Sequence, residues 1–554
     1  MPVHRTATAR AAALLAAPLA AALLAGCGGH ESAPAALVAP VACADLASRT
    51  VPASAIGLPT GGASVTSAAV VMAATGNYCQ VLGKIAGATN APNSGASATP
   101  DIRFQLNLPV GWNGKAVQMG GAGYNGVVVD ATAPVPFAPA SVPLAQGYAT
   151  FGSDSGHTGS GASAEFALDE AAIANFGHEH LKKTRDVAVA LIRLHYQRLP
   201  TRLYFAGAST GGREGMTAIE RYPADYDGVV ASAPALNFTG VRLHGVKIGQ
   251  AAYGTPGGHV SRAKQVLIRD TVLAQCDADD GVADRIVANV RTCRAKSAAI
   301  LAALRCAGGA DLGERCLSDA QLATVRAVAD DLLLPYRLAH GVERHQGYNI
   351  LQGADFSGPL GLGGSATLLA PPTFDNGYLF AQGDGYVKYF VAKNAALDTL
   401  RFDVNNPGAL LPRLVELSAT VGATNPDLDA FRARGGKVIL MHGLADEVIS
   451  PNATIAYYQG QVAHYGQDSV DGFMRFYTVP GFGHGTGAFL PSWDALAVLD
   501  QWVTAGTAPG ALSATDTSPA TKGRGRPLCR YPAYPRYLGS GSVDTAASFA
   551  CVSN

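Results

Sequence analysis

Charge is scarce in this chain, and neither sign is in excess. Asp, Glu, Lys and Arg make up only 15% of the 554 residues, with 41 basic and 41 acidic side chains. Proteins that bind nucleic acids present a basic face, so we expect no nucleic-acid partner. The sequence is instead 48% hydrophobic. This predicts a large buried core, and the length favours more than one domain.

Common metal-binding and phosphate-binding motifs are missing as well. The nine cysteines form no C-x-x-C pair and have no histidines grouped near them, which argues against a zinc site. The glycine-rich segment at 120–123 is not followed by Gly-Lys-Ser/Thr and lacks the G-x-G-x-x-G spacing. It is therefore a poor candidate for a phosphate-binding loop.

Long apolar runs are absent beyond the N-terminus. Residues 11–25 are apolar and follow two arginines, a pattern that is typical of a secretory signal and too short to span a bilayer. Leu24–Cys27 resembles a bacterial lipobox, which implies cleavage before Cys27 and lipidation of its thiol. We expect a signal peptide over 1–26 and a tether over 27–40. The protein is expected to be exported as a periplasmic or outer-membrane lipoprotein whose only membrane contact is this lipid, with the cell surface and secretion as alternatives.

The cysteine count agrees with export. If Cys27 is lipidated, eight cysteines remain, and an even number in an oxidising compartment indicates disulfides. Eight cysteines allow many pairings. Their order suggests four local ones, namely Cys43 with Cys79, Cys276 with Cys293, Cys306 with Cys316, and Cys529 with Cys551.

The most informative motif surrounds Ser209. The segment Gly207–Gly211 reads G-x-S-x-G, follows the apolar run 203–206, and precedes a helix-compatible stretch that ends before Pro223. Strand, sharp turn and helix in this order are typical of a nucleophile elbow. The motif predicts a serine hydrolase with Ser209 as its nucleophile, although small residues around a serine also occur in ordinary turns.

A serine nucleophile needs a histidine base and an acid that orients the histidine. In α/β hydrolases the order along the chain is Ser, acid, His. Asp446 follows the strand expected at 437–441, and His484 follows the strand expected at 474–479. Both residues therefore belong at the carboxyl end of the sheet, with Ser209. His442 competes as the base, but its place at the end of a strand favours a structural role.

The reaction also needs two backbone N–H groups that stabilise the developing oxyanion. One comes from the residue after the nucleophile, and the other comes from the loop after the third strand. These donors are expected at Thr210 and in the glycine-rich segment at 120–123, with Gly121, Ala122 and Gly123 as candidates.

An acidic cluster lies at 277–286, between Cys276 and Cys293. Its carboxylates alternate around a glycine, a pattern that suits a calcium-binding loop although the final glutamate of an EF-hand is missing. A solvated acidic turn is the alternative interpretation.

Strands and helices alternate along much of the chain, which predicts a mostly parallel sheet with helices on both faces. The alternation stops after a strand expected at 226–234 and resumes near 437. The fold class is therefore α/β, an α/β-hydrolase core with a large inserted lid domain. Its expected parts are a first core segment over 41–239, the lid over 240–425, a second core segment over 426–510, and a tail over 511–554 that is tied by a disulfide and wraps the surface.

Several stretches together resemble the tannase and feruloyl esterase family, which includes hydrolases of mono(2-hydroxyethyl) terephthalate. The resemblance covers most of the chain. It is carried by Trp112–Lys115, Asp154–Gly159, Ser209–Gly215, Arg221–Gly228, Gly435–Lys437 and His442–Asp446.

The resemblance implies a serine carboxylesterase with Ser209, Asp446 and His484 as the catalytic triad, and a lid that binds the aromatic acyl group. It also implies a structural Ca2+ in the lid, held by the side chains of Asp277, Asp280 and Asp284 and the carbonyls of Val282 and Ile286. We expect a monomer that acts on a small aromatic ester.

Feruloyl esterase activity is the favoured expectation. Tannase activity, terephthalate monoester hydrolysis and a catalytically inactive relative that binds aromatic ligands remain alternatives. Relatives usually join the nucleophile and histidine loops by a disulfide, whereas this chain has Ala208 and Gly485 at those positions. The aromatic-rich stretch 374–390 is expected either to line the substrate pocket or to form the lid core.

Overall fold

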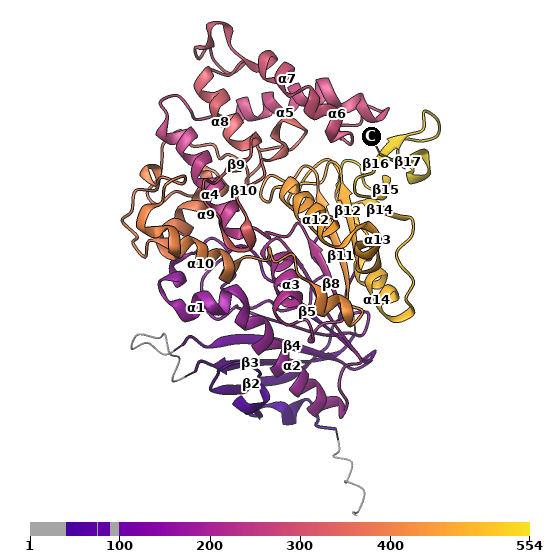
Figure 1. Cartoon of the computed structure of the whole chain (residues 1–554). Coiled ribbons are helices and arrows are strands. Elements are labelled where there is room, and N and C mark those ends of the chain that lie inside the picture. Colours follow the sequence, from indigo (N-terminus) through magenta and orange to yellow (C-terminus); the bar gives the residue numbers. More distant parts are fainter. Residues whose placement is uncertain (1–39, 75, 89–98, 554) are drawn as a thin grey trace, which may run out of the picture. The chain divides into compact units, whose positions relative to one another are not determined.

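Six parallel strands form the centre of the fold (Figure 1). The structure, a computed structural model, describes residues 40–74, 76–88 and 99–553, so the expected signal peptide and Cys27 lie outside the described residues. In spatial order the parallel strands are β6 (Ala149–Ser153), β5 (Lys115–Met119), β7 (Arg202–Ala208), β8 (Gly228–Ser232), β11 (Lys437–Gly443) and β12 (Met474–Val479).

Each face of this sheet is covered by helices, as the alternation of strands and helices predicts. Phe205, Val229 and Leu440 belong to a core with α2 (His180–Tyr196), α3 (Thr210–Arg221) and α12 (Pro451–Tyr465). Their neighbours in sequence, Tyr204, Val230 and Ile439, belong to a separate core with α14 (Ala495–Ala505). Successive strand side chains point to opposite faces, so one sheet supplies both cores.

Antiparallel strands extend the sheet at both edges. On one side β4 (Ile102–Pro109) pairs with β6, followed outward by β3 (Tyr78–Ala86), β2 (Gly62–Val71) and β1 (Thr50–Val51). On the other side β15 (Gly525–Arg530) pairs with β12, followed by β14 (Leu512–Asp516) and β13 (Pro491–Ser492). Two strands of the tail that is expected to wrap the surface, β14 and β15, thus join the edge of the main sheet.

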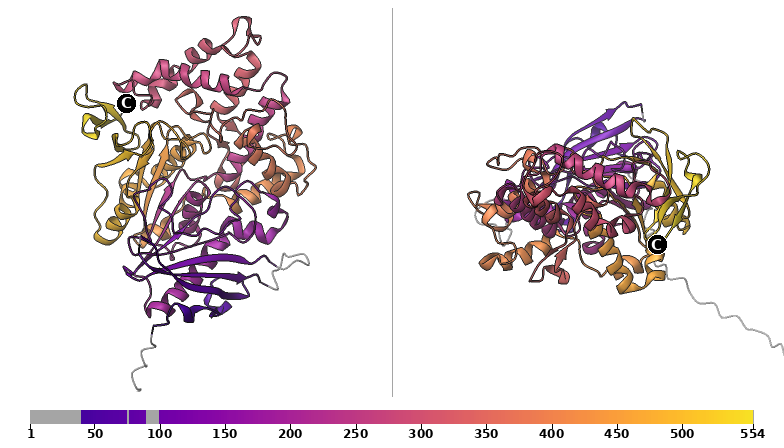
Figure 2. Two further views of the ribbon diagram at one scale, coloured as in Figure 1. Left: turned by 180° about the vertical axis from the view of Figure 1, so that it is seen from behind. Right: turned by 90° about the horizontal axis from the view of Figure 1, so that it is seen from above.

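The connection between β8 and β11, residues 233–436, is a mostly helical insertion, and its hydrophobic core also takes in side chains from outside it, such as Tyr124 and Phe176. Figures 1 and 2 show its helices, magenta to orange, gathered beside the central sheet. Phe380, Tyr386 and Phe390 are at most 2% exposed, so the aromatic stretch at 374–390 mainly forms core. The helices are α4 (Phe238–Gly249), α5 (Arg262–Cys276), α6 (Val290–Ala295), α7 (Ser297–Leu304), α8 (Asp319–Ala329), α9 (Tyr378–Gly385), α10 (Leu411–Val421) and α11 (Asp429–Ala433).

Four disulfides join the cysteines in the local pairs predicted from their order: Cys43–Cys79, Cys276–Cys293, Cys306–Cys316 and Cys529–Cys551. Disulfides persist in oxidising compartments, which agrees with export. Within the described part of the chain, no helix is long and apolar enough to cross a membrane.

Candidate active site

Ser209 lies at the sharp turn between β7 and α3. Its backbone has φ 59° and ψ −124°, a strained conformation for a residue with a side chain, of the kind found at functional sites. The glycines of the motif are needed for close packing, since a Cβ on Gly211 would lie 2.7 Å from the carbonyl oxygen of Gly121. The local geometry is that of the predicted nucleophile elbow.

Asp446 is fully buried in the loop after β11 and is held from two sides. Its Oδ1 accepts the backbone N–H groups of Val448 and Ile449, each at 2.8 Å, and its Oδ2 lies 2.9 Å from Nδ1 of His484. Burial alone raises the pKa of this carboxyl. The charge of His484 and hydrogen bonds from His442 and His484 outweigh burial and hold the pKa well below its ordinary value. Asp446 is thus a fixed anion that orients the histidine.

His484 lies in the loop after β12. Burial lowers the pKa of its imidazole, but the Asp446 carboxylate raises it more, so the net pKa is above the ordinary value. With Nδ1 bonded to Asp446, Nε2 is left to exchange a proton with a substrate or nucleophile. The Phe137 ring and the imidazole pack in a T-shaped arrangement with a centroid distance of 5.4 Å.

His442 has no free ring nitrogen. Its Nδ1 lies 2.9 Å from the Thr454 hydroxyl, and its Nε2 lies 3.0 Å from the carbonyl oxygen of Ile449 and 3.3 Å from Asp446. The side chain is fully buried. These contacts agree with the structural role expected for it.

Ser209, Asp446 and His484 meet at one edge of the sheet because they follow β7, β11 and β12, which are parallel members of one run of strands. Asp446 and His484 are hydrogen-bonded. Across the described residues, Ser209 Oγ makes no hydrogen bond to His484. The serine therefore lies at the same edge of the sheet as Asp446 and His484 but is not hydrogen-bonded to the histidine. Catalytic hydrogen bonds commonly tighten only when substrate binds.

The loop at 120–123 faces the start of α3, but only some of its N–H groups are available. The N–H of Gly121 donates to Oε2 of Glu214 at 2.9 Å, and the Asn125 amide donates to Oε1 of Glu214 at 2.6 Å. The expectation of Gly121 as an oxyanion donor therefore conflicts with the structure, because this donor is already engaged. Among the described residues, the N–H groups of Ala122 and Gly123 have no protein acceptor.

Thr210 connects the nucleophile turn to the same loop. Its hydroxyl donates to the carbonyl oxygen of Gly123 at 2.6 Å, while its N–H lies in the first turn of α3, where helix donors have no partner within the helix. Sequence reasoning missed Glu214, which is fully buried and holds the loop from α3. Its acidic side chain among the glycines after Ser209 marks an unusual position, but the local pattern does not show that it contacts the loop at 120–123.

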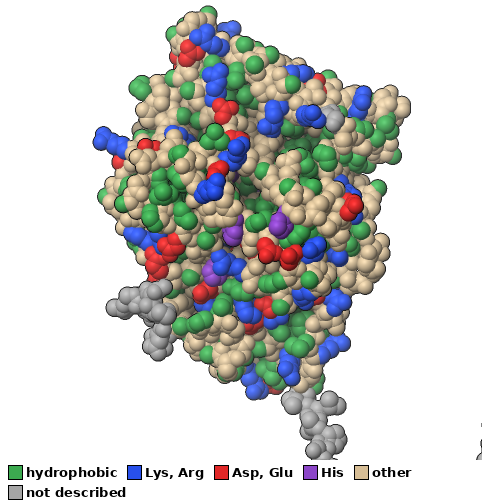
Figure 3. Space-filling view, viewed as in Figure 1, with side chains coloured by type: hydrophobic (Ala, Val, Ile, Leu, Met, Phe, Trp, Pro, Cys, Tyr) green, Lys and Arg blue, Asp and Glu red, His purple; other side chains and the backbone are tan. Residues whose placement is uncertain are grey.

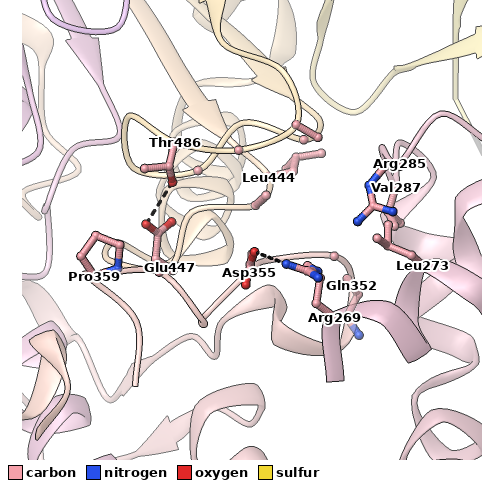
Figure 4. Close-up of a pocket in the computed structure, with 17 residues that line it drawn as sticks. Arg269, Leu273, Arg285, Val287, Gln352, Asp355, Pro359, Leu444, Glu447 and Thr486 are labelled. Atoms are coloured by element: carbon pink, nitrogen blue, oxygen red, sulfur yellow. Dashed lines mark hydrogen bonds and ion pairs between the residues drawn. The ribbon is translucent and has the colours of Figure 1, made fainter. Parts of the chain in front are cut away.

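A cavity of about 390 Å³ adjoins the acid and histidine loops. Figure 3 shows a hollow near the centre of one face, bordered by hydrophobic and basic side chains. In Figure 4, Glu447 and Thr486 from the two loops lie on one side of the cavity, and Arg269 and Arg285 lie opposite them. The volume is in the range of small-molecule sites.

The acidic loop between α5 and α6 is engaged with protein groups. Asp277 accepts the N–H groups of Asp284, Arg285 and Ile286, and Asp284 pairs with Arg526 of β15. Among the described residues, no group of three or more His, Cys, Asp or Glu side chains is gathered as in a metal site. The oxygen-rich donor set nevertheless suits a hard cation. Burial and the charges of Asp284 and Asp277 raise the pKa of Asp280 to about 7.

Gly485 occupies a backbone conformation that disfavours a cysteine. Its φ is +80°, and a Cβ there would lie 3.4 Å from the Phe137 ring. An L side chain is strained at this φ. The backbone of the histidine loop at position 485 therefore favours the glycine that is present.

Comparison with known proteins agrees with this geometry. Residues 79–552 match the sequence profile of tannase and feruloyl esterase. The chain is 40% identical to an uncharacterized esterase of Agrobacterium fabrum, over 92% of each chain, and 31% identical to the mono(2-hydroxyethyl) terephthalate hydrolase of Piscinibacter sakaiensis, over 86% of this chain and 85% of that one.

A solved structure supports the fold. The crystal structure of feruloyl esterase B from Aspergillus oryzae superposes with a TM-score of 0.73 at 23% identity, covering 88% of this chain and 97% of that one. The chain therefore has the α/β-hydrolase fold and belongs to the tannase and feruloyl esterase family of carboxylic ester hydrolases.

Proposed function

We propose that the protein hydrolyses esters of aromatic acids through an acyl-enzyme on Ser209. The observation that carries this proposal is the buried Asp446–His484 pair at the edge of the sheet where Ser209 lies on its strained turn. An acid-oriented histidine beside an elbow serine is the machinery of acyl transfer.

In the first half-reaction Ser209 Oγ attacks the ester carbonyl and His484 Nε2 takes its proton. Asp446 stabilises the imidazolium, and the N–H groups of Thr210 and of Ala122 or Gly123 stabilise the oxyanion. His484 then gives the proton to the departing alkoxide. In the second half-reaction a water attacks the acyl-enzyme with the same histidine as base, which releases the acid and restores Ser209.

Aromatic acids are the favoured acyl groups because relatives over most of the chain are named as a mono(2-hydroxyethyl) terephthalate hydrolase and a probable feruloyl esterase. The 390 Å³ cavity beside the catalytic loops has room for such an acid. Of the possible substrates we favour feruloyl-type esters, with gallate esters and terephthalate monoesters as alternatives. Comparing kcat/KM for methyl ferulate, methyl gallate and a terephthalate monoester decides among them.

The assignment of the nucleophile is tested with a fluorophosphonate probe and an activated aromatic ester. Wild type should be labelled at Ser209 and release alcohol in a burst, and Ser209→Ala should lose both. Ser155→Ala is a matched control, since Ser155 also has a positive φ of 63°, and it should retain labelling. A wild-type protein that binds ferulate but is not labelled would instead be a binding protein.

We propose in addition that Ca2+ is held by the side chains of Asp277, Asp280 and Asp284 with the carbonyls of Val282 and Ile286. A divalent cation would offset the repulsion that raises the pKa of Asp280. Its role would be structural. We propose too that Cys27 carries the lipid anchor of an exported monomer.

A further inference from the structure

The loop that carries His484 has little stiffness of its own. Glycine occupies every second position from 481 to 487, and three of these glycines, Gly481, Gly485 and Gly487, have positive φ. Glycine-rich backbone has the most conformational freedom to lose on folding. The loop has some backbone hydrogen bonds of its own, such as Gly483 N–H to the Thr486 carbonyl oxygen at 2.8 Å, and contacts from outside the loop can fix the histidine backbone further.

Those contacts come from the acid loop. The N–H of Ala445 donates to the carbonyl oxygen of Phe482 at 3.0 Å. Glu447 accepts the backbone N–H of His484 on Oε2 at 3.0 Å and the Thr486 hydroxyl on Oε1 at 3.3 Å. Glu447 is only 3% exposed, and Figure 4 shows its carboxylate turned toward Thr486.

We propose that Glu447 is a positioning residue that holds the catalytic histidine for proton transfer with Ser209. The proposal deepens the proposed function and rests on it. Asp446 holds the imidazole through Nδ1, and the next residue holds the backbone N–H of the same histidine. Ring and backbone of His484 are thus both hydrogen-bonded to the loop that follows β11.

A carboxylate at this place is costly, which argues against a merely structural contact. Burial and the Asp446 charge, partly offset by His484, raise the pKa of Glu447 to about 7. A neutral side chain would bridge the loops at lower cost. A carboxylate makes charge-assisted hydrogen bonds, which are stronger, and its charge raises the pKa of His484.

Across the cavity from Glu447, the charged side chains of Arg269, Arg285 and Asp355 line the wall. Arg269 is paired with Asp355 at 3.1 Å. The charges nearest to Glu447 are therefore those of Asp446 and His484, the two groups whose proton exchange it is placed to influence.

The test measures fluorophosphonate labelling, kcat, KM and Tm for Glu447→Ala, Glu447→Gln and Thr486→Val. Labelling reports activation of Ser209 whatever the natural ester is. We expect Glu447→Ala to lower the labelling rate and kcat by about 10- to 100-fold, because a displacement near 1 Å has effects of that size. The losses of kcat and of labelling rate should exceed any change in KM, which is measured because Glu447 also lines the cavity. Thr486→Val should cost a few-fold, and Thr486→Ser should retain the wild-type rate.

Glu447→Gln distinguishes charge from contact. Its amide oxygen can still accept the N–H of His484, so we expect a smaller loss of kcat than in Glu447→Ala. In Glu447→Gln the acid limb of the pH profile of kcat/KM should shift to lower pH, because the negative charge that raises the pKa of His484 is gone. Glu416→Gln, an exposed change on α10, should alter neither the rates nor this limb.

Glu447 variants with wild-type labelling and an unchanged acid limb would overturn the proposal. So would losses that only track a lower folded fraction in the Tm measurement. If Glu447→Ala does not fold, Glu447→Gln and Thr486→Val decide the question by the same criteria. A wild-type protein that is not labelled would instead refute the nucleophile assignment, which keeps the two failures apart.

Discussion

Replacement of Asp446 by Asn tests the catalytic role of this residue most directly. Oδ1 accepts two backbone N–H groups, from Val448 and Ile449. An asparagine keeps both bonds only if its carbonyl oxygen occupies that place, because its NH2 group cannot accept a hydrogen bond. The NH2 group must then face Nδ1 of His484, where Asp446 now accepts.

This orientation forces the wrong tautomer on the base. With a donor facing it, Nδ1 becomes the acceptor and the ring proton moves to Nε2. A histidine protonated at Nε2 cannot take the Ser209 proton. We expect kcat to fall by about 10³- to 10⁴-fold, which corresponds to about 4 to 5 kcal/mol of transition-state stabilisation. KM should stay within about twofold, since the substrate cavity is untouched.

Steady-state hydrolysis of an activated aromatic ester, with thermal unfolding in parallel, measures this effect. Asp468→Asn is the matched control, because Asp468 is exposed on α13 (Gln467–Phe473) and should leave kcat unchanged. A folded Asp446→Asn enzyme within tenfold of the wild-type kcat would refute the reasoning that Asp446 sets the tautomer of the base.

Three further predictions follow from the site and its supports. Activity should fall as the pH is lowered through the raised pKa of His484, because the protonated imidazole cannot act as a base. The pH of half-maximal activity should therefore lie above 6.5, the ordinary pKa of histidine, and a midpoint below 6.5 would contradict this prediction. Ca2+ at 100 times its Kd should stabilise the wild type by about 2.7 kcal/mol. Asp280→Asn should abolish this stabilisation. Asp279→Asn should retain it, because the Asp279 carboxylate pairs with Lys296 in the wild type. Thermal unfolding with EDTA and with added Ca2+ distinguishes the two variants. Replacing both Cys276 and Cys293 by Ser should cost about 3 kcal/mol, because the disulfide closes a segment with a sequence separation of 17, and denaturant titration measures the loss.

Local features of the site could be predicted from the sequence. The glycines around Ser209 indicated a sharp turn, and the strand expected at 474–479 has those bounds in the structure. Asp446 and His484 were identified because each follows a strand, and the ends of parallel strands share one edge. The disulfides followed sequence order because each joins cysteines no more than 36 residues apart.

Contacts between distant segments could not be predicted in this way. The N–H of Gly121 is engaged because Glu214, 93 residues later, reaches it from α3. The tail enters the sheet because the edge of β12 is open to β15. Neither fact leaves a trace in the local pattern of residues, since a hydrogen bond depends on where two elements are packed.

The sequence by itself determined the chemistry of the site and the order of its parts, because a serine on a turn, an acid and a histidine after strands are local features of the chain. Only the tertiary structure decided which N–H groups are free and what holds the histidine loop. Glu447 is 37 residues from His484 in sequence, yet it accepts that residue's backbone N–H. Such a contact exists only because β11 and β12 lie side by side and end together.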